Sequence, residues 1–175
     1  MEPFFEKFYD KYHNDLYQYV FYMVKNRHVT EDLVQDIYIK VLRSYENFDG
    51  KSTEKTWLFS IARHVTIDYF RKQGRTRKRF MEFFNWNDNE EILRDKESLP
   101  EELMEKNEQS RRIYHGLDQC TTDQKNVIIL RFIQGMSIHE TAETLGFSES
   151  KVKTTQHRGL KVLKRVLEKE GEVVE

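Results

Sequence analysis

The chain has 175 residues, of which 38% are hydrophobic, enough to form a core in one domain or in two small domains. Its 7 glycines and 2 prolines favour an all-α protein with few turns, and its single cysteine, Cys120, excludes an internal disulfide, as a reducing cytoplasm would require. No apolar run approaches the ~20 residues that span a bilayer, and the N-terminus lacks a signal-peptide pattern, so we expect a cytoplasmic protein.

Charge is segregated along the chain, although the formal net charge is −1. Residues 51–80 hold 9 basic and 2 acidic side chains, whereas residues 81–110 hold 3 basic and 10 acidic ones. A basic face binds phosphates by releasing counterions, and acidic blocks oppose that attraction in the free protein. We therefore expect the chain to bind DNA poorly alone and better once a partner holds the acidic parts aside.

Two amphipathic helices are predicted in the first part of the chain. Residues 4–25 carry large apolar side chains, many of them aromatic, at three- and four-residue steps. Thr30 is predicted to cap a second helix that ends near Tyr45, with acidic residues in its first turn. With a third helix that follows a turn, these elements are expected to form a compact helical domain over residues 1–76.

Basic and aromatic side chains alternate on that third helix, which is predicted to begin at Ser52 or Thr53 and to continue to Arg75. Such interleaving suits single-stranded DNA, because bases stack on aromatic rings and phosphates pair with cations. The alternative is that each aromatic ring belongs to the core, as Trp57 and Tyr69 would if they packed on the first helix. The presence of a second DNA-facing helix later in the chain favours nucleic-acid binding.

Residues 77–104 are predicted to be an acidic linker, because regular periodicity fades there and Pro100 interrupts its end. Five large apolar residues between Phe80 and Trp86 are unusual in a solvated tether. We therefore expect part of this segment to dock on a partner or on a domain. Helical periodicity returns from about Glu101.

Turn chemistry in the C-terminal third predicts a helix-turn-helix. Residues 121–124 and 137–140 each match a capping box, so a helix should begin at each. Gly146 supplies the left-handed residue that ends a helix, and Ser148 can cap the next one. Two helices joined by so short a turn place the second in the DNA major groove.

The last predicted helix is strongly basic, with no acidic residue between Ser150 and Leu167. Residues near its start, Glu149 to Thr154, are placed to reach base edges, and later basic residues are better placed for phosphates. A solvated amphipathic helix is the alternative interpretation. The missing carboxylates together with the turn chemistry favour DNA binding.

Other kinds of site have little support in the sequence. Six histidines and Cys120 show no paired ligand motif, so we predict no metal site and no cofactor. No nucleophile elbow, phosphate loop or pair of catalytic carboxylates is present, so we predict neither an enzyme nor a small-molecule substrate. A nucleic-acid enzyme is the weaker alternative.

Three segments resemble the extracytoplasmic-function sigma factors, the small two-domain sigma subunits of bacterial RNA polymerase. Residues 32–41 resemble the polymerase-docking helix of region 2, residues 56–71 its −10 recognition and melting helix, and residues 148–158 the −35 reading helix of region 4. The resemblance implies an all-α fold of two small helical domains, region 2 over residues 1–76 and region 4 with its helix-turn-helix over residues 105–170, joined by the acidic linker.

The resemblance also implies three sets of functional residues. Polymerase docking is assigned to Asp32, Leu33, Gln35, Asp36 and Lys40. Recognition and melting of the −10 element are assigned to Trp57, Ser60, Arg63, His64, Ile67, Arg71, Lys72 and Arg75. Reading of the −35 element is assigned to Glu149, Ser150, Lys151, Lys153, Thr154, His157, Arg158 and Lys161.

The function that the resemblance implies is that of an alternative sigma factor. It would bind core RNA polymerase through the clamp helices and the flap of the large subunits, recognise promoter DNA, and melt it without ATP. Family members are usually held inactive by an anti-sigma factor, often membrane-bound. A free-standing helix-turn-helix regulator is the alternative; it explains residues 137–165 but leaves residues 31–75 unexplained.

Overall fold

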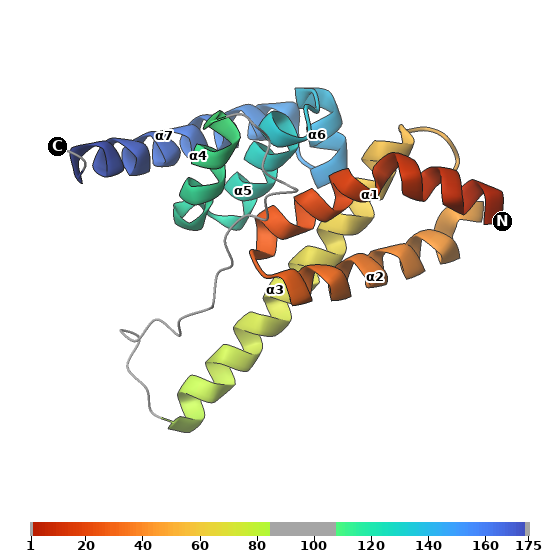
Figure 1. The fold of residues 1–175 in the computed structure, drawn as a ribbon, viewed down its shortest axis with the longest axis horizontal. Helices are drawn as coiled ribbons and strands as arrows, with labels where there is room; N and C mark the ends of the chain where they lie inside the picture. The colour runs from red at the N-terminus through yellow and green to blue at the C-terminus, as the bar shows by residue number, and fades with distance from the viewer. Residues whose placement is uncertain (1, 85–107, 174–175) are drawn as a thin grey trace.

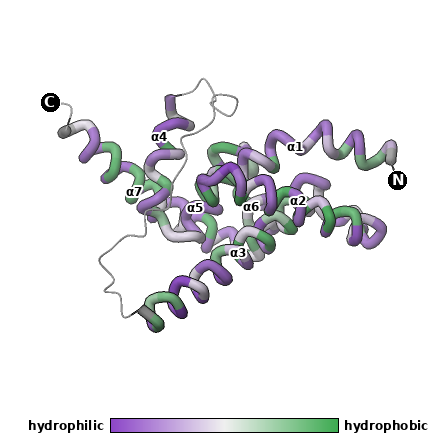
Figure 2. Tube along the Cα trace, turned by 60° about the horizontal axis from the view of Figure 1, so that its bottom comes forward, coloured by the Kyte–Doolittle hydropathy of each residue, from purple (hydrophilic) through white to green (hydrophobic). Residues whose placement is uncertain are grey.

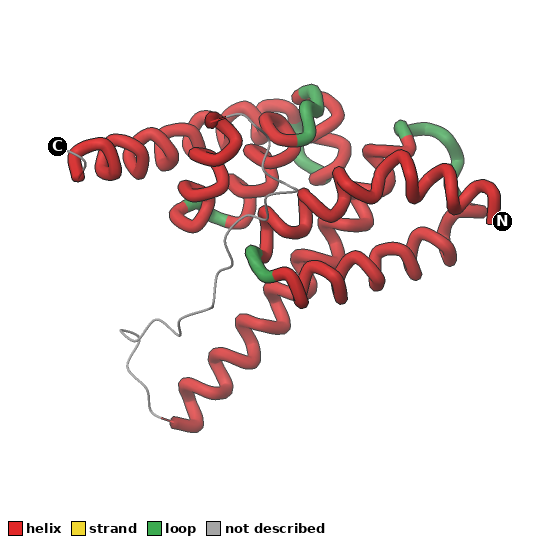
Figure 3. Tube along the Cα trace, viewed as in Figure 1, coloured by secondary structure: helices red, strands yellow, loops and turns green. Residues whose placement is uncertain are grey.

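The computed structural model describes residues 2–84 and 108–173, and the regular structure in these ranges is helical, with no strand (Figures 1 and 3). The N-terminal elements are α1 (Glu2–Val24), α2 (Arg27–Ser44), η1 (Tyr45–Asn47) and α3 (Glu54–Phe84). The C-terminal elements are α4 (Glu108–Gly116), η3 (Leu117–Gln119), α5 (Thr122–Ile128), η4 (Ile129–Ile133), α6 (Ile138–Leu145) and α7 (Glu149–Val173). The all-α prediction is confirmed. None of the described helices combines the length and apolarity that crossing a membrane requires.

Helix α1 is the centre of the molecule. Its stretch from Tyr19 to Met23 is buried at five consecutive positions, each at most 3% exposed. A helix that buries every side of more than one turn must be covered from more than one direction. Here α2 and α3 pack on one side to form the N-terminal bundle, and η4 of the C-terminal bundle, α4–α7, packs on another.

The start of α2 differs from the prediction. Asn26, not Thr30, is the N-cap: its side chain accepts a hydrogen bond from the Val29 backbone N–H at 2.9 Å. Thr30 lies buried inside the first turn, where its hydroxyl donates to the Asn26 carbonyl at 2.7 Å. Lys25, in the left-handed region with φ 52°, turns the chain tightly enough for the helix to begin four residues earlier than predicted.

Helix α3 begins where predicted but ends later. Thr53 caps it by accepting a hydrogen bond from the Thr56 backbone N–H at 3.1 Å. It then continues to Phe84, so residues 77–84, which the sequence analysis placed in the linker, are helical. This end projects away from both bundles (Figures 1 and 2), and five of its eight residues are Arg, Lys, Met or Glu, which are good helix formers. The rest of the predicted linker, including Trp86, lies outside the described residues.

The predicted turn chemistry of the C-terminal bundle is confirmed. Both capping boxes form, at residues 121–124 and 137–140. Gly146 ends α6 in the left-handed conformation at φ 66°, and the Ser148 hydroxyl accepts a hydrogen bond from the Lys151 backbone N–H at 3.1 Å. Between α5 and α6, η4 is a wide π-helical turn.

Helices α5 and α7 approach each other closely at a glycine. A Cβ added to Gly159 would lie 2.6 Å from Cδ1 of Ile128, which is closer than packed carbons tolerate. Glycine at this position therefore lets α7 rest directly on α5.

The two bundles pack against each other, and we call this packing the closed arrangement. Nζ of the buried Lys25, in the turn between α1 and α2, donates to the Tyr114 carbonyl of α4 at 2.6 Å and lies 3.2 Å from the Asp118 carboxylate. Nearby, the buried Tyr19 hydroxyl donates to the Asn126 side chain of α5. Polar groups this deeply buried need such partners, so these bonds specify where the C-terminal bundle sits.

A second set of contacts closes the other end of the interface. The Gln134 side chain donates to Gln18 at 3.1 Å and to the Asp15 carbonyl at 3.2 Å. Helix α6 also packs against α3, the helix that carries the predicted −10 residues. The closed arrangement therefore places the C-terminal bundle beside one of the two predicted DNA-binding surfaces.

Candidate nucleic-acid interface

Helix α7 presents a continuous polar face to solvent. Its inward side is set by Val152, Gly159 and Leu163, which are buried against the rest of the bundle. The opposite side carries the predicted −35 residues, and all eight are exposed: Glu149, Ser150, Lys151, Lys153, Thr154, His157, Arg158 and Lys161. The helix thus brings the whole predicted set together on its solvent-facing side.

Two residues at the start of α7 are held by neighbours. The Glu149 carboxylate lies 3.1 Å from Nδ1 of His139 in α6. Nζ of Lys151 lies 3.7 Å from the centroid of the Phe147 ring and 3.7 Å from the Asp123 carboxylate. Both side chains are therefore oriented before any ligand arrives, though these exposed pairs are weak.

Beside them lies a shallow pocket that the sequence analysis did not predict. It has a volume of about 510 Å³ and is lined by Thr121, Asp123, Gln124, Ser148, Ser150, Lys151, Thr154, Thr155 and Arg158. The pocket brings the capped start of α5 next to the start of α7. In the sequence, the capping box at residues 121–124 already indicated the helix N-terminus that lines one side of this pocket. Backbone N–H groups at a helix N-terminus favour anions.

On α3, the predicted −10 residues divide into two groups. His64, Arg71, Lys72 and Arg75 are exposed, and Trp57, Ser60, Arg63 and Ile67 are half-buried. The half-buried group lies in the first half of the helix, within reach of both bundles. The exposed basic group begins where α3 leaves the molecule (Figure 1).

Trp57 belongs to an aromatic cluster of the N-terminal bundle. Its ring centroid lies 4.9 Å from that of Phe48, 6.2 Å from that of Tyr45 and 6.4 Å from that of Phe8. The interpretation that this aromatic ring packs in the bundle therefore holds. Because the side chain is only half-buried, part of the indole also faces solvent.

His64 is exposed and has a defined orientation. Its Nδ1 lies 2.7 Å from the Ser60 backbone carbonyl, so Nδ1 is the nitrogen that carries the proton. In the neutral ring, Nε2 is then left as a hydrogen-bond acceptor facing away from that carbonyl.

Arg63 is covered by the C-terminal bundle. Its guanidinium carbon lies 5.7 Å from the centroid of the Phe147 ring, just after α6. Its Nε is buried and has no hydrogen-bond partner among the described residues. An unsatisfied buried donor costs free energy, so this contact weakens the closed arrangement.

The predicted polymerase-docking residues lie on α2. Asp32, Gln35, Asp36 and Lys40 are exposed, whereas Leu33 is only 7% exposed and packs in the core of the N-terminal bundle. Leu33 therefore holds the helix in place and does not present a side chain to a partner in this arrangement.

Two exposed apolar residues adjoin these polar ones and were missed by the sequence analysis. Ile39 is 46% exposed and Leu42 is 42% exposed. Counted along the helix from Asp32, Gln35 and Asp36, they fall on the same side of α2. We call this surface, formed by Asp32, Gln35, Asp36, Ile39 and Leu42, the outer face of α2.

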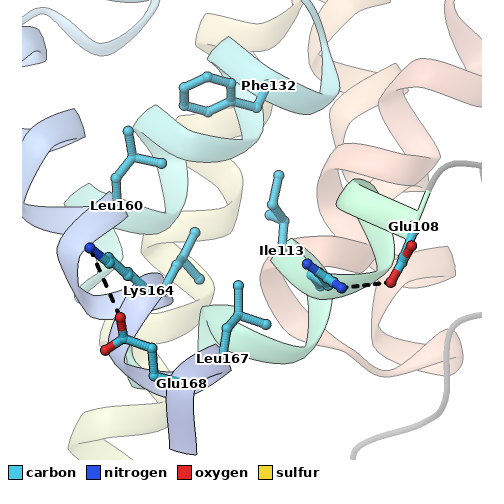
Figure 4. A pocket seen from close by; sticks show the side chains of 9 residues that line it. Glu108, Ile113, Phe132, Leu160, Lys164, Leu167 and Glu168 are labelled. Carbon is cyan, nitrogen blue, oxygen red and sulfur yellow. Dashed lines mark hydrogen bonds and ion pairs between the residues drawn. The ribbon is translucent and has the colours of Figure 1, made fainter. Parts of the chain in front are cut away.

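The C-terminal bundle also carries an open apolar groove of about 850 Å³ (Figure 4). Its apolar lining is Ile113, Phe132, Leu160, Leu163 and Leu167, from α4, η4 and α7. Two ion pairs flank it, Arg112 with Glu108 at 2.7 Å and Lys164 with Glu168 at 3.9 Å. Phe132 and Leu160 are 37% and 39% exposed, so the groove is accessible to a partner.

Cys120 is a packing residue. It is buried, its Sγ lies 3.9 Å from the Gly116 carbonyl, and burial raises the pKa of its thiol, which disfavours the reactive thiolate. Within residues 2–84 and 108–173, no three His, Cys, Asp or Glu side chains gather closely enough to hold a metal ion.

Fold and site together define an all-α DNA-binding protein with a basic helix in each of two bundles. The sequence model of Sigma-70 region 2 matches residues 8–76, and that of Sigma-70, region 4 matches residues 116–165. The chain is 60% identical over 168 residues to the ECF RNA polymerase sigma factor SigX of Bacillus subtilis (strain 168), covering 96% of this chain and 86% of that protein. It is 31% identical to the RNA polymerase sigma factor YlaC of the same organism, covering 95% and 94%.

The chain belongs to the ECF family of RNA polymerase sigma factors. It is therefore a promoter-recognition factor and not a free-standing helix-turn-helix regulator, since the region 2 match accounts for residues that a simple regulator leaves unexplained.

Two solved structures share its fold. One is the sigma factor RpoE in complex with the anti-sigma factor NepR from Bartonella quintana, with a TM-score of 0.71 at 22% identity over 94% of this chain and 96% of that one. The other is CnrH in complex with the cytosolic domain of CnrY, with a TM-score of 0.68 at 22% identity over 96% and 90%.

Proposed function

We propose that α7 reads the −35 element, that α3 captures and melts the −10 element, and that core polymerase docks on the outer face of α2. The observation that carries the proposal is the exposed polar face of α7, which follows directly from the helix-turn-helix caps. A recognition helix held this way enters the major groove with its first turns against base edges.

Within α7 the roles divide along the helix. Glu149 can accept a hydrogen bond from the exocyclic amine of cytosine, and Lys151 or Lys153 can donate to guanine O6 and N7. His157, Arg158 and Lys161 lie further along and suit backbone phosphates, which position the helix without specifying sequence.

At the −10 element, bases must leave the duplex to be read. The acceptor Nε2 of His64 suits an exposed base amine, and Arg63, Ser60 and Ile67 complete the wall of that site. Arg71, Lys72 and Arg75 bind the phosphates of the same strand. Binding to the unpaired strand supplies the energy of melting, so no ATP is needed and the RNA chemistry belongs to polymerase.

Polymerase docking combines charge with apolar area. The outer face of α2 offers Ile39 and Leu42 beside three polar residues, which is the composition of an interface core with a polar rim. The clamp helices of the large subunit are the partner that we assign to this face, and an apolar helix of the flap is assigned to the groove in Figure 4. The site of action is the cytoplasm, where polymerase is found.

The closed arrangement is the resting state of this proposal. It covers Arg63 with Phe147, so full −10 binding requires the bundles to separate. Polymerase, by binding each bundle at a different place, favours the open form. An anti-sigma factor, membrane-bound in many family members, is the partner that we expect to favour the closed form.

Run-off transcription with purified core polymerase tests the proposal. Discrete transcripts from fragments of the chain's own genome should appear only when the protein is added. The outcome that would overturn the proposal is a core polymerase that neither binds the protein nor gains promoter-specific initiation.

A further inference from the structure

The DNA-facing side of α7 begins with an acidic residue. Among the predicted −35 residues, Glu149 is the one that carries a carboxylate, and the others are basic or neutral. Phosphates repel a carboxylate, so Glu149 lowers the general attraction of α7 for DNA. A carboxylate accepts a hydrogen bond from the amine of cytosine and is repelled by the acceptor atoms of guanine. Glu149 is therefore suited to selecting sequence at the expense of general affinity.

Selection by a carboxylate depends on where the carboxylate points. The helix fixes the direction in which a side chain leaves the backbone, but a glutamate is long and populates several rotamers beyond that point. A glutamate that turns freely can rotate away from a wrong base, and the penalty against that base is then lost. A contact from outside α7 is needed to hold the Glu149 carboxylate in one place.

His139, near the start of α6, supplies that contact. Its Nδ1 lies 3.1 Å from Oε1 of Glu149. On the other side of the ring, Nε2 lies 3.2 Å from Oε1 of Glu143, one turn further along α6. Carboxylate oxygens only accept hydrogen bonds, so the ring nitrogen is the donor in each bond that forms. The two carboxylates together orient the imidazole ring, and the ring in turn orients Glu149.

The backbone on both sides of this contact is held by helix caps. The capping box of Ser137 and Glu140 fixes the turn of α6 that carries His139, and the Ser148 hydroxyl caps the start of α7. Within residues 2–84 and 108–173, His139 is the one ion-pair partner of Glu149. The contact uses Oε1 of the carboxylate, so we assign the other oxygen, Oε2, to the base.

We propose that His139 is a positioning residue for −35 specificity, which holds the Glu149 carboxylate toward a cytosine amine through its Nδ1 hydrogen bond. This inference rests on the proposed function, since it needs α7 to lie on the −35 element with Glu149 at a base edge. The His139 and Glu149 side chains are 69% and 53% exposed, and an exposed pair changes an equilibrium by only about 1.4- to 5-fold. Bound DNA excludes water from the pair and strengthens it, so we expect an effect of about three- to fivefold.

Two substitutions of His139 separate the roles of its ring nitrogens. Nδ2 of asparagine is the same number of bonds from Cβ as Nδ1 of histidine, and Nε2 of glutamine matches Nε2 of histidine in the same way. His139→Asn therefore keeps a donor toward Glu149, whereas His139→Gln keeps a donor toward Glu143 only. The histidine side chain is largely exposed, so neither change removes buried packing, which circular dichroism and thermal melts check.

The assay is binding of wild-type or variant holoenzyme to a promoter mapped by run-off transcription, with each base pair of the −35 element replaced in turn. Glu149→Ala identifies the base pair that Glu149 reads, because discrimination should fall there and nowhere else. At that base pair His139→Gln should reduce the preference for the native base about three- to fivefold, and His139→Asn should retain the preference. In a Glu149→Ala background, His139→Gln should cause no further loss.

The possible failures can be told apart. His139→Gln with wild-type discrimination, or with an equal loss at every base pair of the element, overturns this inference alone. Equal losses in His139→Asn and His139→Gln also overturn it, because the Nδ1 bond is then not the cause. If Glu149→Ala changes discrimination at no base pair, the base-reading role of Glu149 is wrong and this inference with it. A wild type that opens no promoter overturns the whole proposed function.

Discussion

Lys25 is the residue whose removal should open the closed arrangement most directly. Its Nζ donates to the Tyr114 carbonyl at 2.6 Å, lies 3.2 Å from the Asp118 carboxylate, and lies 4.2 Å from the Tyr114 ring centroid. Lys25→Met keeps most of the aliphatic stem and removes the charge that joins the two bundles. Both residues carry a Cβ, so the cost of the positive φ at this position is unchanged.

The expected loss of free energy in the closed arrangement follows from how deeply the Lys25–Asp118 ion pair is buried. Removing one partner of a buried ion pair costs about 3–5 kcal/mol. The Asp118 side chain is 27% exposed, so water partly replaces its lost partner, and a cost of about 2 kcal/mol is expected. That shifts the ratio of closed to open protein by roughly 30-fold. If the open form binds DNA, the apparent affinity of the free protein should rise by up to roughly the same factor.

The assay is fluorescence anisotropy of a labelled forked −10 DNA titrated with the free protein, with Lys7→Met as the control. Lys7 is exposed on α1, the helix that precedes Lys25, so its variant loses the same charge without touching the interface. Hydrogen exchange at the α4 backbone should accelerate in Lys25→Met only. Equal DNA affinity and equal exchange in the two variants would refute the reasoning that this contact holds the bundles together.

Three further outcomes are expected. Burial lowers the pKa of His13, which stacks on Tyr9, so the unfolded chain takes up the proton first as pH falls below about 6.5. The free energy of unfolding measured in urea should therefore fall between about pH 7.5 and 5.5, and it should fall less in His13→Gln than in the wild type. An equal fall in the two proteins would contradict this. Gly74→Ala, in open space on α3, should raise the free energy of unfolding by about 0.5–1 kcal/mol, whereas Gly159→Ala should lower it by about 1–3 kcal/mol because the new methyl group clashes with α5. Thermal melts that rank the two variants the other way would be inconsistent with the packing. His64→Phe should reduce open-complex formation roughly tenfold through loss of the Nε2 acceptor, and a variant as active as wild type would remove His64 from the −10 site.

Local chemistry explains the elements that could be predicted from the sequence. Residues 137–140 and Gly146 specify helix ends through bonds to their immediate neighbours, and both ends form as expected. The prediction that Thr30 caps α2 was wrong, because Lys25 turns the chain and Asn26, four residues earlier, caps the helix instead.

Features that depend on long-range packing could not be predicted. The helix over residues 77–84 could not be predicted from a buried stripe, because none of its residues whose burial is described is buried. The closed arrangement depends on partners such as Lys25 and Tyr114, 89 positions apart, which no local pattern connects. For the same reason the order of polar and apolar residues along α2 did not show that Ile39 stays exposed while Leu33 is buried.

The central claim is that this sigma factor lets polymerase melt a promoter through binding energy alone. Permanganate reactivity of thymines in the −10 region tests it most directly, with holoenzyme on a promoter fragment and no nucleoside triphosphate present. The account predicts reactive thymines with holoenzyme and none with core polymerase, and a weaker signal with Arg63→Ala. Thymines that stay unreactive under a bound holoenzyme, or react only after ATP is added, would contradict it.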